Sequence, residues 1–243
     1  MLIFKLILIL HLLVDFYFQS DDSIQKKENE KIQFSSLISS EMFKHFVVNT
    51  LLFSLIFLIF QTNQGINVFI IYLLIVSHIV IDCLKVMLSR CLPTMKKSHF
   101  VIDQLFHMII LFLISHYLSI NFTTNFNLAA YSLHINAILS ILLLSKTSNV
   151  IFNTLFSNFK PKDELEDNEH KNAGALIGTM ERLLIMGFLI LGNATALGFI
   201  ITAKSLARYS KLSKTQFGEY FILGTLYSTL YTLIVYFSLF HVL

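Results

Sequence analysis

Histidine and aspartate recur four residues apart in three apolar stretches of this sequence. Residues four apart lie on one face of an α-helix, so each pair presents an imidazole and a carboxylate toward the same point. Nitrogen and oxygen donors of this kind suit Zn²⁺, Mn²⁺ or iron, and a bound ion can activate water as a nucleophile near neutral pH. The three pairs are His11 with Asp15, His78 with Asp82 and, in the reversed order, Asp103 with His107.

The composition around these pairs is that of a membrane protein. Of 243 residues, 55% are hydrophobic and only 14% are charged, and the mean hydropathy is +0.70. A soluble core of this length does not need so much apolar surface, and disordered, collagenous and disulfide-rich chains have other compositions. A net charge of +3 is too small to indicate a nucleic-acid partner. We therefore expect an all-α, polytopic transmembrane helical bundle.

About eight helices are expected from the long apolar runs. Residues 1–145 would form an N-terminal bundle with the His/Asp motifs, 146–172 a cytoplasmic polar linker, and 173–243 C-terminal helices packed on the first bundle. The eight runs are Met1 to Gln19, Phe43 to Gln61, Ile66 to Met87, His99 to Ser119, Leu128 to Ser145, Ala173 to Leu191, Ala194 to Ala207 and Phe217 to Val242.

Lysine and arginine gather in alternate connections between these helices, which is typical of cytoplasmic loops. The pattern predicts a multi-pass protein of the inner (cytoplasmic) membrane with both termini outside, and it favours a first span over a cleaved signal peptide. All three aspartates then lie within about two turns of the cytoplasmic surface. The basic groups are Lys26, Lys27 and Lys31; Lys85, Arg90, Lys96 and Lys97; Lys146, Lys160, Lys162 and Lys171; and Lys204, Arg208, Lys211 and Lys214.

An ionisable residue inside a spanning helix costs about 2.5 to 3.5 kcal/mol, so each needs a partner, a wet cavity or a function. The alternative to a metal site is a set of interhelical hydrogen bonds and ion pairs that only hold the bundle together. Three such pairs at one depth favour a shared site. His45 reaches a similar depth from the second helix.

A second polar group lies in the C-terminal third. Gly174 and Gly178 permit close helix packing, and Glu181 and Arg182 follow inside the membrane. Because neighbours on a helix point about 100° apart, Glu181 and Arg182 need not pair with each other. Lys204 and Arg208 would extend toward the interface, bind an anionic head group or neutralise Glu181.

Six segments together resemble the bacterial membrane family called domain of unknown function 3307. That resemblance covers most of the chain but implies no activity, since the family has none assigned. Its His-x-x-x-Asp helices are similar to those of membrane-bound metal-dependent hydrolases, an analogy between sites. The segments are His11 to Gln19, His78 to Lys85, Phe100 to His107, Gly174 to Leu184, Ala203 to Tyr209 and Glu219 to Ser228.

The leading hypothesis is a metal-dependent hydrolase of a lipid-linked or amphipathic phosphoester, with membrane lipids or such a substrate as partner. The alternatives are a transporter that binds protons or a cation with the same residues, and a structural membrane protein. The cofactor would be a divalent metal, zinc or manganese. Its ligands would be His11, Asp15, His78, Asp82, Asp103 and His107; the catalytic residues Asp15, Asp82, Asp103, Gln104 and Glu181; and the substrate-binding residues Gln19, His45, Lys85, Lys204 and Arg208.

Overall fold

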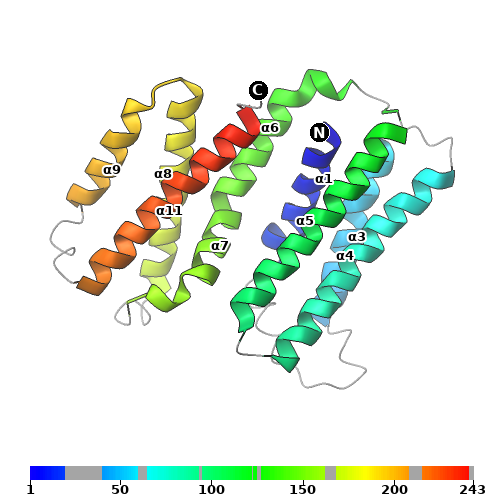
Figure 1. Cartoon of the computed structure of the whole chain (residues 1–243), viewed down its shortest axis with the longest axis horizontal. Helices are drawn as coiled ribbons and strands as arrows, with labels where there is room; N and C mark the ends of the chain where they lie inside the picture. The colour runs from blue at the N-terminus through cyan, green and yellow to red at the C-terminus, as the bar shows by residue number, and fades with distance from the viewer. Residues whose placement is uncertain are drawn as a thin grey trace. The chain divides into compact units, whose positions relative to one another are not determined.

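The computed structural model is helical, and it contains no strand in the residues that it describes (Figure 1). Those residues are 1–19, 40–59, 65–92, 95–121, 123–124, 127–161, 168–207 and 215–240. Each of the eight apolar runs forms a helix within this part of the chain. The expected all-α class is therefore confirmed.

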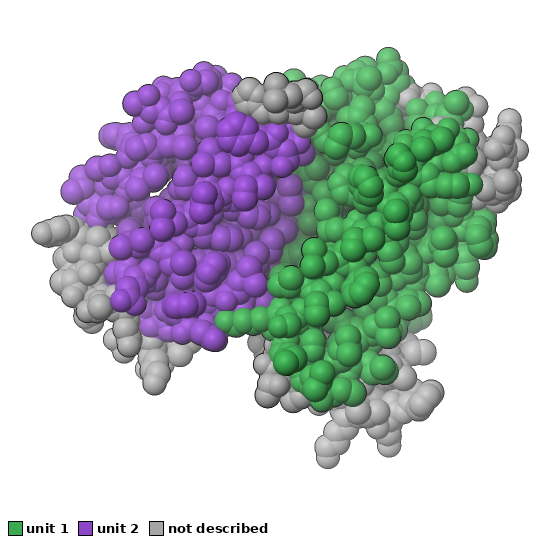
Figure 2. Space-filling view, in the orientation of Figure 1, with its two compact units in different colours: residues 1–139 green, residues 140–243 purple. Residues whose placement is uncertain are grey.

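The chain divides into two compact units, Met1–Leu139 and Ser140–Leu243, which Figure 2 colours separately. The first unit is built on four helical segments. They are α1 (Leu2–Leu12), which continues as the π-helix η1 (Leu13–Tyr17); α3 (Ser40–Ser54), which continues as the 3₁₀ turn η3 (Leu55–Leu58); α4 (Gly65–Cys91); and α5 (Lys96–Asn121). The 3₁₀ turn η5 (Leu128–Tyr131) leads into α6 (Ser132–Leu142), which carries the chain across the unit boundary.

The second unit begins with a π-helix, η6 (Leu143–Thr147), in which Ser145 has non-helical dihedral angles (φ −91°, ψ −115°). Helix α7 (Ser148–Leu155) and the 3₁₀ turn η7 (Ser157–Phe159) follow, inside the stretch expected as a polar linker. Three longer segments complete the unit: α8 (Asn168–Ile190), α9 (Thr195–Ala207) and α11 (Thr215–Phe240). In this unit α8 packs against α11 and α9.

Five helical segments are long and apolar enough to cross a membrane by length and composition. In the most apolar window of each, only 28% of the residues are buried inside the structure, so large apolar side chains such as Ile109, Phe112 and Leu113 of α5 face outward. That exposure fits a lipid environment. The five are Val68–Ser89, Lys97–Asn121, Leu128–Leu155, Ala173–Ile190 and Phe217–Phe240. The expected spans in α1, α3 and α9 are helices but are not among the five.

Within the first unit, α5 packs against α1 and α4, and α3 packs against α1 and α4 (Figure 1). Apolar side chains such as Ile7, Phe53, Leu74 and Leu111 fill the space between the helices. Because the connection between α4 and α5 is short, the two helices run antiparallel. Residues equally far from that connection therefore lie at the same level, which places His78 opposite His107.

Candidate metal centre

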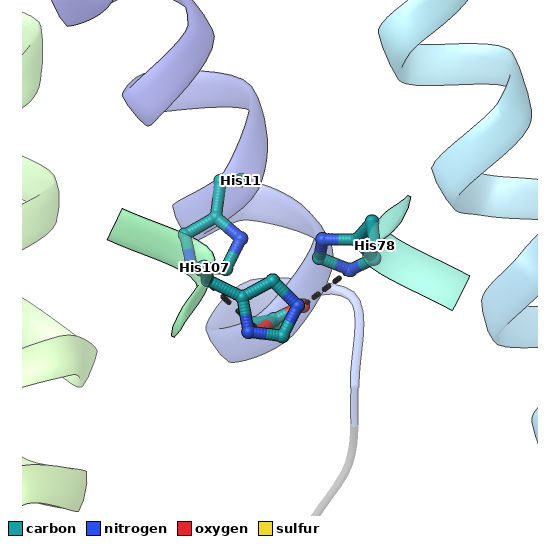
Figure 3. Close-up of side chains that lie close together, drawn as sticks. His11, His78 and His107 are labelled. Carbon is teal, nitrogen blue, oxygen red and sulfur yellow. Dashed lines mark ion pairs between the residues drawn. The ribbon is translucent and has the colours of Figure 1, made fainter. Parts of the chain in front are cut away.

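Three of the helices in the first unit bring their His/Asp pairs to one point. Figure 3 shows the rings of His11, His78 and His107 converging from α1, α4 and α5. The ring centroids of His78 and His107 are 4.4 Å apart, and those of His11 and His107 are 4.8 Å apart. All three side chains are buried, with at most 2% of each residue exposed. Reversal of the motif in α5 compensates for the reversed direction of that helix.

Asp15 lies at the centre of the first group of donors. Its Oδ1 is 3.1 Å from Nε2 of His78 and 3.8 Å from Nε2 of His45. Its Oδ2 is 3.8 Å from Nε2 of His11. Asp15, His11, His78 and His107 form one set of four whose donor atoms lie within 4.8 Å of one another, and Asp15, His45, His78 and Asp82 form a second, overlapping set. That spacing is compatible with a shared metal ion, whose ligands lie about 2.0 to 2.2 Å from it.

Asp82 belongs to a second, overlapping group. Its Oδ2 is 2.8 Å from Nε2 of His45 and 3.5 Å from Nε2 of His78, while its Oδ1 is 3.9 Å from Nε2 of His107. His45 comes from α3, where its neighbourhood carries no His/Asp pair. The sequence assigned it to substrate binding; the structure places it among the potential ligands. Its depth from the start of α3 was the only signal for that position.

The π-helix η1 changes the register of the chain at Asp15. Phe18 N donates to the carbonyl of Leu13 at 2.8 Å, a bond that spans five residues instead of the four of an α-helix. The turn is wider, so Asp15 is rotated relative to a regular i+4 position. It thereby reaches both His78 and His45 as well as His11 of its own helix. π-turns of this kind recur at functional sites.

The ring of His107 is held in one tautomer. Its Nδ1 lies 3.0 Å from the main-chain carbonyl oxygen of Asp103, which can only accept a hydrogen bond. Nδ1 therefore carries a proton, and Nε2 faces the cluster, 3.9 Å from Oδ1 of Asp82. A backbone carbonyl in this position is a common orienting partner of metal-binding histidines.

Several buried nitrogens in the cluster have no hydrogen-bond partner in the described part of the chain. They include both ring nitrogens of His11 and Nε2 of His107. A buried polar atom without a partner costs about 1 to 3 kcal/mol, so simple interhelical hydrogen bonding does not account for these rings. Coordination of a divalent cation would satisfy the lone pairs, and the residues fit such an ion by donor type and by convergence.

Asp103 is fixed from two directions. Lys85 Nζ donates to its Oδ2 at 2.7 Å, and Gln104 Nε2 donates to the same oxygen at 3.1 Å. Gln104 also reaches Oδ2 of Asp15 at 3.5 Å. The free edge of the carboxylate turns toward His107, whose Nδ1 is 3.6 Å from Oδ1. Gln104, expected to be catalytic, donates to the carboxylates of Asp103 and Asp15, while Lys85, expected to bind substrate, is paired with Asp103.

Four other predicted residues are outside this cluster. Gln19 follows η1 by two residues and is not among the grouped metal donors. Glu181 and Lys204 belong to the second unit. Arg208 lies outside the described residues, so its expected role in substrate binding has no structural counterpart here.

Glu181 and Lys204 form a buried ion pair between α8 and α9, through Nζ and Oε2. The chain reverses at Gly192, whose φ of +73° suits glycine. Glu181 lies 11 residues before this glycine and Lys204 lies 12 after it, so the antiparallel helices place them at one level. Of the alternatives for Lys204, neutralisation of Glu181 is the one that the structure contains.

Arg182 turns away from Glu181 into a separate network. Its Nε donates to the carbonyl oxygen of Leu144 at 2.6 Å, and Nη2 donates to Oδ1 of Asn149 at 2.7 Å. The distorted helix η6 makes the carbonyl of Leu144 available to a side chain. Nη1 reaches Oγ of Ser228 in α11 at 3.4 Å. These partners could not be predicted from the sequence, because the distortion at Ser145 has no local sequence signature.

Comparison with known proteins confirms the family that the sequence resembles, over the N-terminal part of the chain; the three C-terminal segments of the resemblance lie outside the match. The family model described as "Protein of unknown function (DUF3307)" matches residues 3–136, which is more than half of the chain. This match includes every residue of the His/Asp cluster. A search of curated proteins finds no match, and a search of solved structures also finds none.

Proposed function

This chain belongs to the DUF3307 family, whose description carries no activity, and we propose from its own site that it is a membrane-embedded, metal-dependent hydrolase. The proposed substrate is a lipid-linked or amphipathic phosphoester that reaches the site from one face of the membrane. One observation carries the proposal: four imidazoles and three carboxylates converge from four helices at a buried point. They are His11, His45, His78, His107, Asp15, Asp82 and Asp103.

A bound metal accounts for the cluster better than helix packing does, because packing leaves either repelling charges or unpaired polar atoms among the buried rings. The ring centroids of His11, His78 and His107 are 4.4 to 5.2 Å apart, so three imidazolium ions at these positions would repel one another strongly. Three neutral imidazoles would instead leave buried lone pairs unused, as at His11 and His107. A divalent ion resolves both difficulties, because it binds neutral imidazoles and balances the carboxylates.

The chemistry that such an ion supplies is a water molecule acidified to act as a nucleophile near neutral pH. The residues of the chain would position the reactants. Gln104 orients Asp15 and Asp103 through its amide hydrogens, and Asp103 in turn fixes the ring of His107 through its carbonyl. Asp103 is our candidate general base, since its Oδ1 faces the cluster while Lys85 holds Oδ2.

The substrate class follows from where the cluster lies and from its nearest cation. Asp82 and Asp103 lie within about 15 Å of the ends of α4 and α5 that the short connection joins, so the site is near one end of two spanning helices. The side chain of Lys85 is 35% exposed beside it. An anionic head group at the membrane surface could approach there while its acyl or prenyl tail remains in lipid.

The test combines metal analysis with turnover in detergent. Wild-type protein, Asp82→Asn and His107→Ala are purified, their metal content is measured, and phosphate release from phosphatidic acid is followed with added Zn²⁺ or Mn²⁺. We expect metal and turnover in the wild type, and a lower metal content with loss of turnover in the two variants. A wild-type protein that neither binds nor responds to metal would overturn the metal function. Metal binding without hydrolysis of this or a water-soluble aryl phosphate would overturn the hydrolase.

A transporter is the second candidate, and the Glu181–Lys204 pair favours it. This pair lies about 12 Å along α8 from the start of its membrane-spanning segment, and it is not among the donors of the proposed metal site. Intramembrane carboxylates paired with a cation are typical of proton and ion pathways. Flux of protons or Mn²⁺ into proteoliposomes would separate the two functions, because a hydrolase turns over in detergent without a gradient.

A further inference from the structure

The number of ligands in the cluster exceeds what one ion needs. Structural and catalytic Zn²⁺ sites take four or five ligands, and an octahedral ion takes six. Here seven side chains converge, and three of them are carboxylates with two oxygens each. The candidate donor sets overlap at shared aspartates instead of forming one shell. The distribution of these donors around the two shared aspartates, Asp15 and Asp82, indicates how many ions the cluster can bind.

Asp15 presents its two oxygens to different histidines. Oδ2 lies toward Nε2 of His11 at 3.8 Å. Oδ1 lies toward Nε2 of His78 at 3.1 Å and toward Nε2 of His45 at 3.8 Å. One oxygen of Asp15 therefore faces His11 on its own helix, α1, and the other faces His45 on α3 and His78 on α4.

Asp82 divides the histidines in a matching way. Its Oδ2 lies toward His45 at 2.8 Å and His78 at 3.5 Å, the same two rings that face Oδ1 of Asp15. Its Oδ1 lies toward Nε2 of His107 at 3.9 Å. The rings of His11 and His107 are in turn neighbours, with centroids 4.8 Å apart. Each carboxylate thus turns one oxygen toward His45 and His78 and the other toward a third imidazole, which is His11 for Asp15 and His107 for Asp82.

We propose that this site holds two divalent cations, bridged by the carboxylates of Asp15 and Asp82. One ion would be bound by His11 and His107 with Asp15 Oδ2 and Asp82 Oδ1. The other would be bound by His45 and His78 with Asp15 Oδ1 and Asp82 Oδ2. Each half-site then has two nitrogens and two oxygens, a donor set suited to Zn²⁺, Mn²⁺ or iron. The inference rests on the metal site of the proposed function.

The third carboxylate has a different part in this arrangement. Asp103 accepts from Lys85 and Gln104 through Oδ2, and its main-chain carbonyl fixes the tautomer of His107. Besides its proposed role as general base through Oδ1, it therefore positions the ring of His107 in the His11/His107 half-site. His78 lies closest to the boundary, since its ring is 4.4 Å from that of His107 and 5.8 Å from that of His45. Its nitrogen contacts with both bridging aspartates assign it to the His45 side.

The charge of the filled site indicates what would bind to it. Two divalent ions bring four positive charges, of which Asp15 and Asp82 neutralise two, while Asp103 is already paired with Lys85. A doubly charged phosphate group would complete the balance. Paired ions of this kind clamp the attacking and leaving oxygens of phosphoester substrates. Inorganic phosphate is therefore expected to bind only when both half-sites are filled.

The experiment counts metal ions per chain in protein loaded with Mn²⁺ and freed of excess ion. We expect two ions per wild-type chain and an electron paramagnetic resonance spectrum of exchange-coupled Mn²⁺. His11→Ala and His45→Ala should each retain one ion with an uncoupled spectrum, and both should lose phosphate binding by at least tenfold. His116→Ala, an exposed histidine of α5, is the matched control and should retain two coupled ions.

Each outcome decides between the proposals. One ion per wild-type chain, with no coupled spectrum, would overturn the paired site and leave the metal-dependent function standing. No ion at all would overturn both. If His11→Ala or His45→Ala fails to fold, the wild-type stoichiometry and spectrum still decide the inference. Loss of both ions in either single variant, with folding intact, would contradict two separable half-sites.

Discussion

Lys85 of α4 donates a 2.7 Å hydrogen bond to Asp103 of α5, which joins the two helices beside the His/Asp cluster. Only 2% of the Asp103 side chain is exposed, whereas 35% of Lys85 is exposed. The lysine thus neutralises a buried carboxylate although part of its own side chain is exposed. Its ammonium also lies 5.9 Å from the ring centre of Phe100.

Removing this cation should destabilise the first unit. Lys85→Met leaves the Asp103 carboxylate buried without its charged partner, and we expect a loss of about 1 to 3 kcal/mol, seen as a lower melting temperature in detergent. Combining it with Asp103→Asn should recover part of the loss, because no buried charge is then unpaired. An unchanged melting temperature in Lys85→Met would show that the ion pair does not stabilise the first unit, which would leave substrate binding as the role of the lysine.

Metal binding should stabilise the protein against heat. An ion that binds the native state at 100 times its Kd contributes about 2.7 kcal/mol, so a chelator should lower the melting temperature of wild-type protein. In His107→Ala the chelator should lower the melting temperature by less than in the wild type, because this variant lacks a ligand of the His11/His107 half-site. His116→Ala, on the same helix, should behave like the wild type. A wild-type melting temperature that is insensitive to both chelator and added metal would contradict the site.

The Glu181–Lys204 pair should act as a unit. Glu181→Gln leaves the Lys204 ammonium, 20% exposed, without its counter-charge, and we expect destabilisation of about 1 to 3 kcal/mol. The double variant with Lys204→Met should be closer to the wild type, since breaking one side of a buried pair costs more than removing both. Glu219→Gln, an exposed carboxylate on α11, is the control. Equal stability of the single and double variants would show that the two residues do not interact.

Arg182 should not be replaceable by lysine. Its fork contacts Leu144, Asn149 and Ser228 on separate segments of the second unit, and one ammonium cannot reach all three acceptors. We expect Arg182→Lys to lose about 2 to 3 kcal/mol of stability, and Asn149→Ala to lose less, since that change leaves the other contacts intact. A melting curve of Arg182→Lys that overlays the wild type would refute this account.

Much of the fold follows from the sequence alone. Long apolar runs separated by polar stretches determine helices, because a backbone in lipid has to satisfy its own hydrogen bonds. All eight runs are helical, and the boundaries agree within two residues for α9 and α11. The i,i+4 spacing also determined that each imidazole and its aspartate share a helical face. The reversed motif in α5 further indicated an antiparallel neighbour.

Other features were decided only by tertiary structure. His45 has no paired aspartate on its own helix, and its partner Asp82 comes from α4, so no local pattern marks it as a ligand. The π-turns at Asp15 and near Ser145 have no signature in the local sequence, yet they place Asp15 beside His78 and the carbonyl of Leu144 beside Arg182. The division of four histidines by two carboxylates arises from the packing of four helices. Local spacing specifies which face a side chain occupies, but only packing specifies which atoms meet across that face.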